Sequence, residues 1–348
     1  MQLFQSYGIS GKVFSIVESS LSNRKINVVL DKQRSGTYFI TSGVPQGSIL
    51  GSTLFLIYIN DLPDNLICDL VIYADDTTLY SCLNEKSLPE QRLALAKSLE
   101  CDLATVSNWG DTWQVTLNSE KTKVLSSNRY TNTNATQISL SGTVLEESLN
   151  IRLVGLTLSK DMSWNEYVTS IAKQASMKVG SLYRARHYLT PEIILHLYKS
   201  LIRPCMEYCC HIWGSAAVTV LSMLDRIQRR VVNMIGPKLS CSLQSLTHRR
   251  NVASLCFFYR YYNGLCSKEL SALVPQNKIF NRSTRLATNS HLFTVEVPQC
   301  HKQFYARSFF PRISKLWNSL PSCCIPDRVD LQGFKTRVKR HLPGMGVL

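Results

Sequence analysis

The chain has 348 residues, of which 45% are hydrophobic and 18% are charged, so it has the composition of a folded protein with two or three domains rather than of a disordered tail. No apolar run approaches the roughly 18 residues that a membrane span requires, and the first twenty residues lack the apolar core of a signal peptide. The twelve cysteines show no repeated C-x-x-C pair. We therefore expect reduced, buried thiols in an intracellular, non-secreted protein without a membrane partner.

The net charge of +15 is unevenly distributed along the chain. Residues 1–150 carry 11 Lys+Arg and 15 Asp+Glu, whereas residues 151–348 carry 28 and 9, which gives net charges of −4 and +19. A strongly positive field favours a polyanionic partner, and nucleic acid is the commonest one. A basic surface that keeps the protein soluble is the alternative.

The first part of the chain alternates helical and extended patterns. Residues 4–21 are helix-like, residues 26–30 are strand-like, and residues 42–62 form a Gly/Pro loop followed by apolar side chains at helical spacing. Ser48 can cap this helix at its start and Pro63 can stop it.

A short hairpin with two carboxylates is predicted next. The apolar residues 69–73 and the β-branched and aromatic residues 77–80 read as two strands, and Ala74-Asp75-Asp76 reads as the turn between them. Apolar residues three or four apart then predict an amphipathic helix over residues 87–109, and strands follow at 115–117 and 123–125. These elements predict an α+β fold in which helices cover one face of an antiparallel sheet.

The second part is predicted to be mostly helical, with helices at 164–187, 191–210 and 219–235. Thr190-Pro191-Glu192 is a helix start, because Thr caps, Pro fits the first turn and Glu complements the helix dipole, and Gly236-Pro237 is a helix stop. The tail from about residue 275 is expected to be irregular and is rich in aromatic and basic residues.

Five arginines in the helical part are candidates for nucleic-acid contacts. Arg226, Arg229 and Arg230 lie on the helix face opposite the apolar residues, and a solvated face explains them as well as a nucleic-acid contact does. Arg184 and Arg186 alternate with aromatic residues, a pattern that suits contacts to a phosphate backbone and to stacked bases.

The hairpin is a candidate metal site. Adjacent carboxylates such as Asp75 and Asp76 repel each other when both are ionised, unless cations neutralise them. A hard divalent ion such as Mg²⁺ prefers carboxylate oxygens, and two such ions support nucleotidyl transfer. An Asp-Asp turn alone is more often an ordinary polar hairpin tip.

The loop before the predicted helix makes the metal hypothesis more specific. Its two glycines suit a backbone that approaches a substrate closely, its proline is rigid, and a helix starts directly after it. The loop residues are Gly43, Val44, Pro45, Gln46, Gly47 and Ser48.

The order of these motifs resembles that of reverse transcriptases from non-LTR, jockey-like retrotransposons. GVPQGS at 43–48 is followed by LFLIYINDLP at 54–63 and by YADD at 73–76. Residues 201–214 (LIRPCMEYCCHIWG), 315–321 (KLWNSLP) and 334–342 (FKTRVKRHL) are also typical of these elements, so the resemblance covers the whole length. Ser52 stands where the family usually has the proline of its LGP sequence.

The resemblance implies specific roles. Gly43 to Ser48 correspond to the B motif, which positions the template base and the incoming nucleotide, and Asp75 and Asp76 correspond to the C motif, which holds Mg²⁺. Lys121, in the D-motif segment Asn118-x-x-Lys121-Thr122, is the candidate general acid for the leaving pyrophosphate, although an exposed turn lysine is the simpler explanation. Residues 154–158 resemble the strand that grips the primer end. The implied partners are an RNA template and a DNA primer; protein partners are not indicated.

We expect the chain to lack one motif of the family, together with the fingers region that precedes it. The third carboxylate of the family lies in an A motif of the type F-D-x-x-K-A-F-D, upstream of a segment like Tyr7-Gly8-Ile9-Ser10-Gly11. We therefore expect a partial polymerase palm at 1–160, a helical, basic, thumb-like region at 161–260 and a basic region of unknown role at 261–348. Two explanations would account for the missing motif: the element has decayed, or the gene model starts at an internal methionine.

Two functional hypotheses follow. In the first, the chain derives from an RNA-directed DNA polymerase and is inactive alone, because two carboxylates cannot clamp both sides of the displacement. In the second, it is a non-catalytic module that binds RNA or an RNA·DNA hybrid through residues 160–260.

Overall fold

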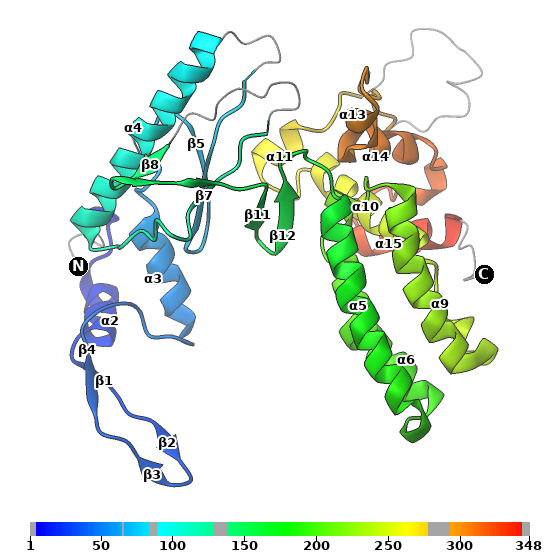
Figure 1. Ribbon diagram of the computed structural model, residues 1–348, viewed down its shortest axis with the longest axis horizontal. Coiled ribbons are helices and arrows are strands. Elements are labelled where there is room, and N and C mark those ends of the chain that lie inside the picture. The colour runs from blue at the N-terminus through cyan, green and yellow to red at the C-terminus, as the bar shows by residue number, and fades with distance from the viewer. Residues whose placement is uncertain (1–4, 65, 84–88, 128–137, 278–292, 343–348) are drawn as a thin grey trace. The chain divides into compact units, whose positions relative to one another are not determined.

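The computed structural model describes residues 5–64, 66–83, 89–127, 138–277 and 293–342 (Figure 1). The chain divides into two compact units, unit 1 at residues 1–149 and unit 2 at residues 150–348. Each unit has its own hydrophobic clusters. Within the described ranges, no helix combines the length and the apolar character that crossing a membrane demands. The boundaries predicted near residues 160 and 260 stay predictions.

Unit 1 mixes helices with short strands. Its helices are α2 (Gly11–Leu21), α3 (Ile49–Ile59) and α4 (Pro89–Trp113). Its strands are β1 (Arg24–Ile26), β2 (Val29–Leu30), β3 (Gln33–Arg34), β4 (Tyr38–Ile40), β5 (Asp69–Tyr73), β6 (Asp76–Tyr80), β7 (Lys123–Val124), β8 (Ser139–Leu140), β9 (Thr143–Val144) and β10 (Glu146–Glu147). The mixed helix and strand content agrees with the prediction.

The strands of the described residues form separate two-stranded ladders instead of the single antiparallel sheet that we expected. Five ladders are antiparallel, and the ladder of β7 with β10 is parallel. The strand expected at 26–30 is interrupted, because β1 pairs with β4 while β2 pairs with β3, so that the two ladders form one nested hairpin.

The strand predicted at 115–117 is wrong. Gln114 has a positive φ of 58°, and the N–H of Val115 donates to the carbonyl of Gly110 at 2.8 Å. This pattern caps the C-terminus of α4 and uses the backbone donor that a strand would need.

Two clusters hold the helices of unit 1 in place. Val17 of α2 packs against Leu54 of α3, and Ile59 at the end of α3 packs against Val106 of α4. Asp61, two residues after the end of α3, accepts a hydrogen bond from the indole N–H of Trp109 at 2.9 Å and so links the end of α3 to α4.

Unit 2 is mostly helical, as expected. It opens with the hairpin of β11 (Asn150–Leu153) and β12 (Leu156–Ser159). The helices are α5 (Asn165–Ala185), η1 (Arg186–Tyr188), α6 (Pro191–Leu197), η2 (Tyr198–Ile202), α7 (Arg203–Glu207), α8 (Cys210–Trp213), α9 (Val218–Ser240), α10 (Leu246–Tyr262), α11 (Lys268–Ala272), α13 (Gln303–Arg307), α14 (Phe309–Asn318), η3 (Ser322–Cys324) and α15 (Leu331–His341).

The predicted helix boundaries in unit 2 hold where a local signal defines them. The Thr190 hydroxyl accepts from the N–H of Ile193 at the start of α6, and the helical backbone breaks at Gly236, where φ is 76° and ψ is 172°. Pro237 then starts one further turn. The helix expected at 191–210 passes through the π-helical turn η2 and ends with α7, before Cys209, which has a φ of 50°.

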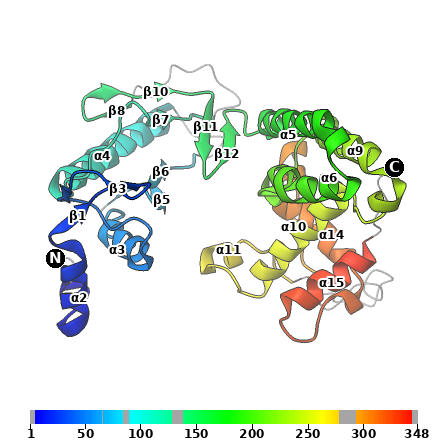
Figure 2. The ribbon, with the colours of Figure 1, turned by 90° about the horizontal axis from the view of Figure 1, so that it is seen from below.

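The prediction of an irregular tail is wrong for the described residues 303–341. Helices α14 and α15 pack on α10 (Figure 2). Trp317 and Phe334 are fully buried. The ring of Phe334 stacks on that of Tyr259 at 4.3 Å. The tail is therefore part of the second hydrophobic core of unit 2.

All twelve cysteines are free thiols, as predicted, but only Cys210 and Cys324 are buried. The other ten are partly or fully exposed, so the expectation of buried thiols is wrong for them. Burial raises the pKa of both buried thiols to about 11, which keeps them protonated near neutral pH.

The stability of unit 2 should depend on pH through two histidines, the partly buried His211 and the buried His248. Burial, reinforced by Arg312, lowers the pKa of His211 to about 4, and burial lowers that of His248 as well. Both pKa values lie below those of the unfolded chain, so the unfolded state binds more protons at mildly acidic pH. The contribution of the two neutral histidines to stability is therefore fully present above about pH 6.5 and is lost as the pH falls toward 4.

We expect the free energy of unfolding, measured by urea titration, to fall between pH 7 and pH 4.5, with His211 contributing about 1 kcal/mol after allowance for its partial exposure. His211→Phe keeps a ring on Phe257 and should flatten this pH dependence. His196 is exposed, and His196→Gln serves as the control. Equal pH slopes in the two variants would contradict the assignment.

Candidate functional site

The two aspartates lie at the tip of a regular hairpin, as predicted. Strands β5 and β6 pair in register from Asp69 opposite Tyr80 to Tyr73 opposite Asp76. Ala74 has a φ of 53°, which allows the tight reversal. Asp75 lies in the turn, Asp76 is the first residue of β6, and both are exposed.

The opposite face of this hairpin is anchored in the core of unit 1. Leu70 and Ile72 of β5 and Leu79 of β6 pack against a buried cluster that includes Ile59 of α3 and Val106 of α4. Because side chains alternate along a strand, Val71 and Tyr73 point away and are exposed. The two carboxylates are therefore held at the tip of a supported hairpin.

A buried carboxylate that we did not predict fixes the chain where it enters this hairpin. Asp102 of α4 is 1% exposed and accepts from the backbone N–H groups of Ile67 at 2.9 Å and of Cys68 at 2.7 Å. Burial and this carboxylate raise the pKa of Cys68 to about 11. The available signal was a carboxylate among the apolar residues of an amphipathic helix, between Leu99 and Val106.

The B-motif loop is joined directly to α3. Gly43 and Gly47 have positive φ values of 74° and 78°, which explains why glycine occupies both positions. The Ser48 hydroxyl accepts from the N–H of Gly51 at 2.9 Å, which confirms the predicted cap. Val44 and Pro45 are partly buried, whereas Gln46, Gly47 and Ser48 are exposed and accessible to a ligand.

Two further residues position the loop, and sequence reasoning missed both. Arg24 donates to the carbonyls of Ser42 at 2.9 Å and Gly43 at 2.5 Å, and its Nε donates to Leu21 at the end of α2. Gly51 is buried, and a Cβ atom there would lie 2.8 Å from the carbonyl oxygen of Pro45. No local pattern marks Arg24, whereas Gly51 lies in the LGP-like sequence that we compared with the family.

The D-motif segment forms a compact turn. The Asn118 side chain accepts from the N–H of Lys121 at 3.0 Å, and the Thr122 hydroxyl donates to the Asn118 carbonyl at 2.8 Å. Lys121 is exposed, and its ammonium group makes no ion pair with any residue that the structure describes. Its role as a general acid stays a prediction.

The strand predicted at 154–158 starts later. Val154 and Gly155 form the turn between β11 and β12, with φ values of 46° and 81°, so only Leu156 onward is extended. The Tyr208 hydroxyl donates to the Val154 carbonyl at 2.9 Å, and its ring lies 3.5 Å from where a Cβ of Gly155 would be. This hairpin belongs to the core of unit 2 through Leu156.

Helices α5 and α9 run side by side in unit 2 and pack on each other (Figures 1 and 2). An open groove with a basic lining lies along the two helices. Its volume is about 890 Å³, and four cationic residues line it: Lys173, Arg184, Arg226 and Arg230. Arg230 also donates to the Ser176 hydroxyl at 2.9 Å. The structure thus brings together three of the five predicted arginines from two helices.

The other two arginines lie outside this groove. Arg229 is exposed on α9 but does not line the groove. Arg186 lies over the Tyr183 ring at 3.8 Å and donates to the Tyr183 carbonyl at 2.7 Å, so a local contact already fixes it.

The donor chemistry at the hairpin suits a hard divalent ion, although the set is small. Asp75 and Asp76 offer carboxylate oxygens, which Mg²⁺ prefers. Among the described residues, no group of three or more His, Cys, Asp or Glu side chains converges on a metal position. The described residues therefore offer two carboxylates as ligands for a metal ion at this hairpin.

The amino-acid sequence was also compared with those of known proteins and protein families. Residues 3–158 match the family model for reverse transcriptase (RNA-dependent DNA polymerase). The chain is 28% identical over 237 residues to the RNA-directed DNA polymerase from mobile element jockey of Drosophila melanogaster, an alignment that covers 65% of the chain and 25% of the relative. It is 27% identical over 243 residues to the RNA-directed DNA polymerase from mobile element jockey of Drosophila funebris, which covers 66% of the chain and 25% of the relative. It is 24% identical over 243 residues, covering 68% of the chain and 26% of the relative, to the probable RNA-directed DNA polymerase from transposon X-element of Drosophila melanogaster.

Residues 3–158 therefore form a reverse transcriptase domain, and this domain is homologous to the RNA-directed DNA polymerases of non-LTR retrotransposons. The chain spans about a quarter of the length of the curated relatives that it matches.

A methyl group at position 51 should displace the B-motif loop. Gly51→Ala places a Cβ against the Pro45 carbonyl, and we expect a stability loss of about 1–3 kcal/mol together with faster amide hydrogen exchange over residues 42–51. Gly36 has open space where its Cβ would lie, so Gly36→Ala is the matched control. Unchanged exchange in Gly51→Ala would show that the close approach does not hold the loop.

Proposed function

We propose that residues 1–348 contribute the nucleotide-, template- and primer-binding part of an RNA-directed DNA polymerase. One observation carries this proposal: both candidate motifs are attached to the same helix. The B-motif loop is capped on the start of α3 through Ser48, and the aspartate hairpin packs on Phe55 and Ile59 of α3. Phe55 follows Ser48 by seven positions, a rise of about 10 Å along the helix.

The proposed roles follow from the chemistry of the exposed groups. Asp75 and Asp76 would hold Mg²⁺, which supplies the charge that activates the primer 3′-hydroxyl and stabilises the leaving pyrophosphate. The loop from Gly43 to Ser48 orients the template base and the nucleotide. Lys121 donates a proton to the pyrophosphate. The finer description of unit 1 as a palm and of the α5–α9 region as a thumb is part of the same proposal, as is an intracellular site of action.

Activity is expected to need a further carboxylate. We expect that the polypeptide 1–348 alone does not extend a DNA primer on an RNA template with Mg²⁺, because two carboxylates cannot clamp both the attacking and the leaving oxygen. Adding an F-D-x-x-K-A-F-D segment from a related polymerase in cis should restore extension, measured on a sequencing gel.

In that extended protein, Asp75→Ala and Asp76→Ala should each lower the extension rate by roughly a hundredfold or more. Asp64 is exposed and lies outside the hairpin, so Asp64→Ala is the matched control. Extension by residues 1–348 alone that Asp75→Ala abolishes would disprove the requirement for the additional segment.

The second candidate function is a non-catalytic module that binds RNA or an RNA·DNA hybrid. The basic α5–α9 groove favours it, since four cations from two helices face one concave surface. Phosphate contacts of this kind weaken with rising salt, because each neutralised phosphate releases counterions.

Fluorescence anisotropy with a labelled RNA·DNA hybrid at 50 to 300 mM salt tests this groove. We expect affinity to fall steeply with salt, and the double variant Arg226→Ala/Arg230→Ala to reduce the slope of log K against log salt by about 2. Arg229→Ala removes the same charge from α9 outside the groove and should leave affinity within about twofold. A double variant that behaves like Arg229→Ala would show that nucleic acid does not occupy the groove.

A further inference from the structure

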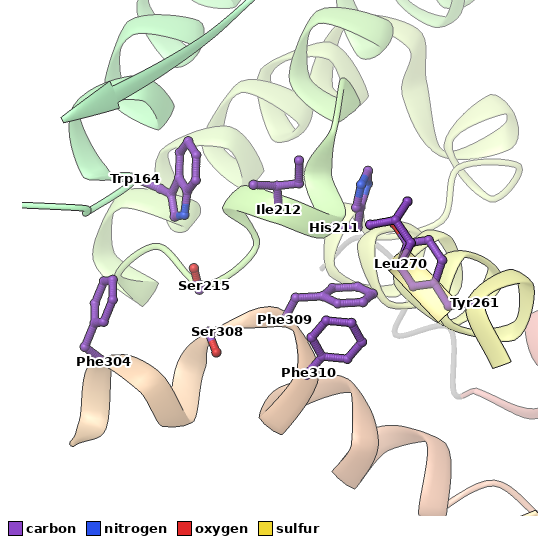
Figure 3. A pocket seen from close by; sticks show the side chains of 10 residues that line it. All are labelled: Trp164, His211, Ile212, Ser215, Tyr261, Leu270, Phe304, Ser308, Phe309 and Phe310. Carbon is purple, nitrogen blue, oxygen red and sulfur yellow. The ribbon is translucent and has the colours of Figure 1, made fainter. Parts of the chain in front are cut away.

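Unit 2 contains a second cavity, which is lined mainly by aromatic rings (Figure 3). Its volume is about 280 Å³. Trp164 and Phe304 lie at one end, and His211, Leu270 and Tyr261 lie at the other. The remaining lining residues are Ile212, Ser215, Ser308, Phe309 and Phe310.

The imidazole of His211 is fixed and uncharged. It stacks on Phe257 with 3.8 Å between the ring centroids and meets the edge of Phe309 at 6.0 Å. Its pKa of about 4 keeps it neutral at pH 7, mainly because burial disfavours the charged form. No lining residue carries a formal charge at neutral pH, so the cavity does not suit a phosphate or a carboxylate.

Two hydroxyl groups lie between the aromatic ends of the cavity. Ser308 donates its hydroxyl to the Tyr305 carbonyl at 2.7 Å, which leaves the Ser308 oxygen as an acceptor. The Ser215 hydroxyl makes no hydrogen bond with any residue in the described part of the chain. The cavity thus combines flat aromatic walls with a few neutral polar groups, a combination that suits an uncharged heteroaromatic ring.

The positive charge around the cavity indicates which kind of molecule would carry such a ring. Residues 151–348 carry a net charge of +19, and α5 joins the cavity to the basic groove. Trp164 occupies the N-cap position of α5, and Lys173, the first cationic groove residue on this helix, follows nine residues later. Nine helical residues rise about 13.5 Å, which is the length of about four stacked nucleotides of a strand.

We propose that this cavity binds one unstacked base of a single-stranded nucleic acid whose phosphates lie in the α5–α9 groove. The inference rests on the nucleic-acid binding proposed above and adds a second, base-dependent contact to it. Stacking on aromatic side chains is available to every base, so the contact is expected to tolerate any sequence.

Phe304 allows a direct test, because it is 42% exposed on α13, and its neighbour Tyr305 is 49% exposed and does not line the cavity. A single-stranded RNA of about twelve nucleotides that contains 2-aminopurine is titrated with the full chain, and quenching of the base fluorescence reports stacking. We expect quenching on binding, and about tenfold weaker binding with loss of quenching in Phe304→Ala. Tyr305→Ala should behave like the wild type.

An oligonucleotide of the same length with abasic sugars separates the two proposals. We expect it to bind about tenfold more weakly than the RNA while keeping the same salt dependence. Equal affinity of the two oligonucleotides, or equal behaviour of Phe304→Ala and Tyr305→Ala, would overturn the base pocket and leave the groove intact. Failure of both oligonucleotides to bind would overturn both proposals.

Discussion

The close contact between the B-motif loop and the start of α3 is the constraint on which the candidate active site depends. The Ser48 hydroxyl caps Gly51, and the absence of a side chain at Gly51 lets the Pro45 carbonyl approach the helix. Because the aspartate hairpin packs on the same helix, a loop and a turn that are some 25 residues apart share one rigid support. Preorganisation of this kind matters for nucleotidyl transfer, where positioning provides much of the catalysis.

The chemistry of the chain is divided between its two units. Unit 1 carries the carboxylates of the C-motif hairpin and has a slightly negative charge, whereas unit 2 carries nearly all of the positive field. Unit 2 uses its cations in a groove between two helices and its aromatic residues in a separate uncharged cavity. In the binding mode that we propose, phosphates and bases would contact different surfaces, which is how single-stranded nucleic acids are commonly bound.

Features that depend on a few neighbouring residues were predictable from the sequence. The Ser48 and Thr190 caps, the YADD hairpin and the backbone break at Gly236 each arise from short-range hydrogen bonding or from the conformational freedom of glycine. The exposure of Arg226, Arg229 and Arg230 followed from helical periodicity, because their face is opposite the apolar one. The strand expected at Val115 did not form, since a helix cap took its backbone donor.

The sequence by itself determined the class of domain, the order of its motifs and those helix ends that a capping residue or a glycine marks, because these depend on local chemistry and on residue spacing. Only the tertiary structure decided which distant residues meet. Asp102 reaches the backbone before the hairpin, and Arg24 reaches the B-motif loop. The tail supplies Trp317 and Phe334 to a core, and the groove selects three of five arginines. Such contacts join residues separated by many positions, and the free energy of packing that selects them has no signature in any single stretch of sequence.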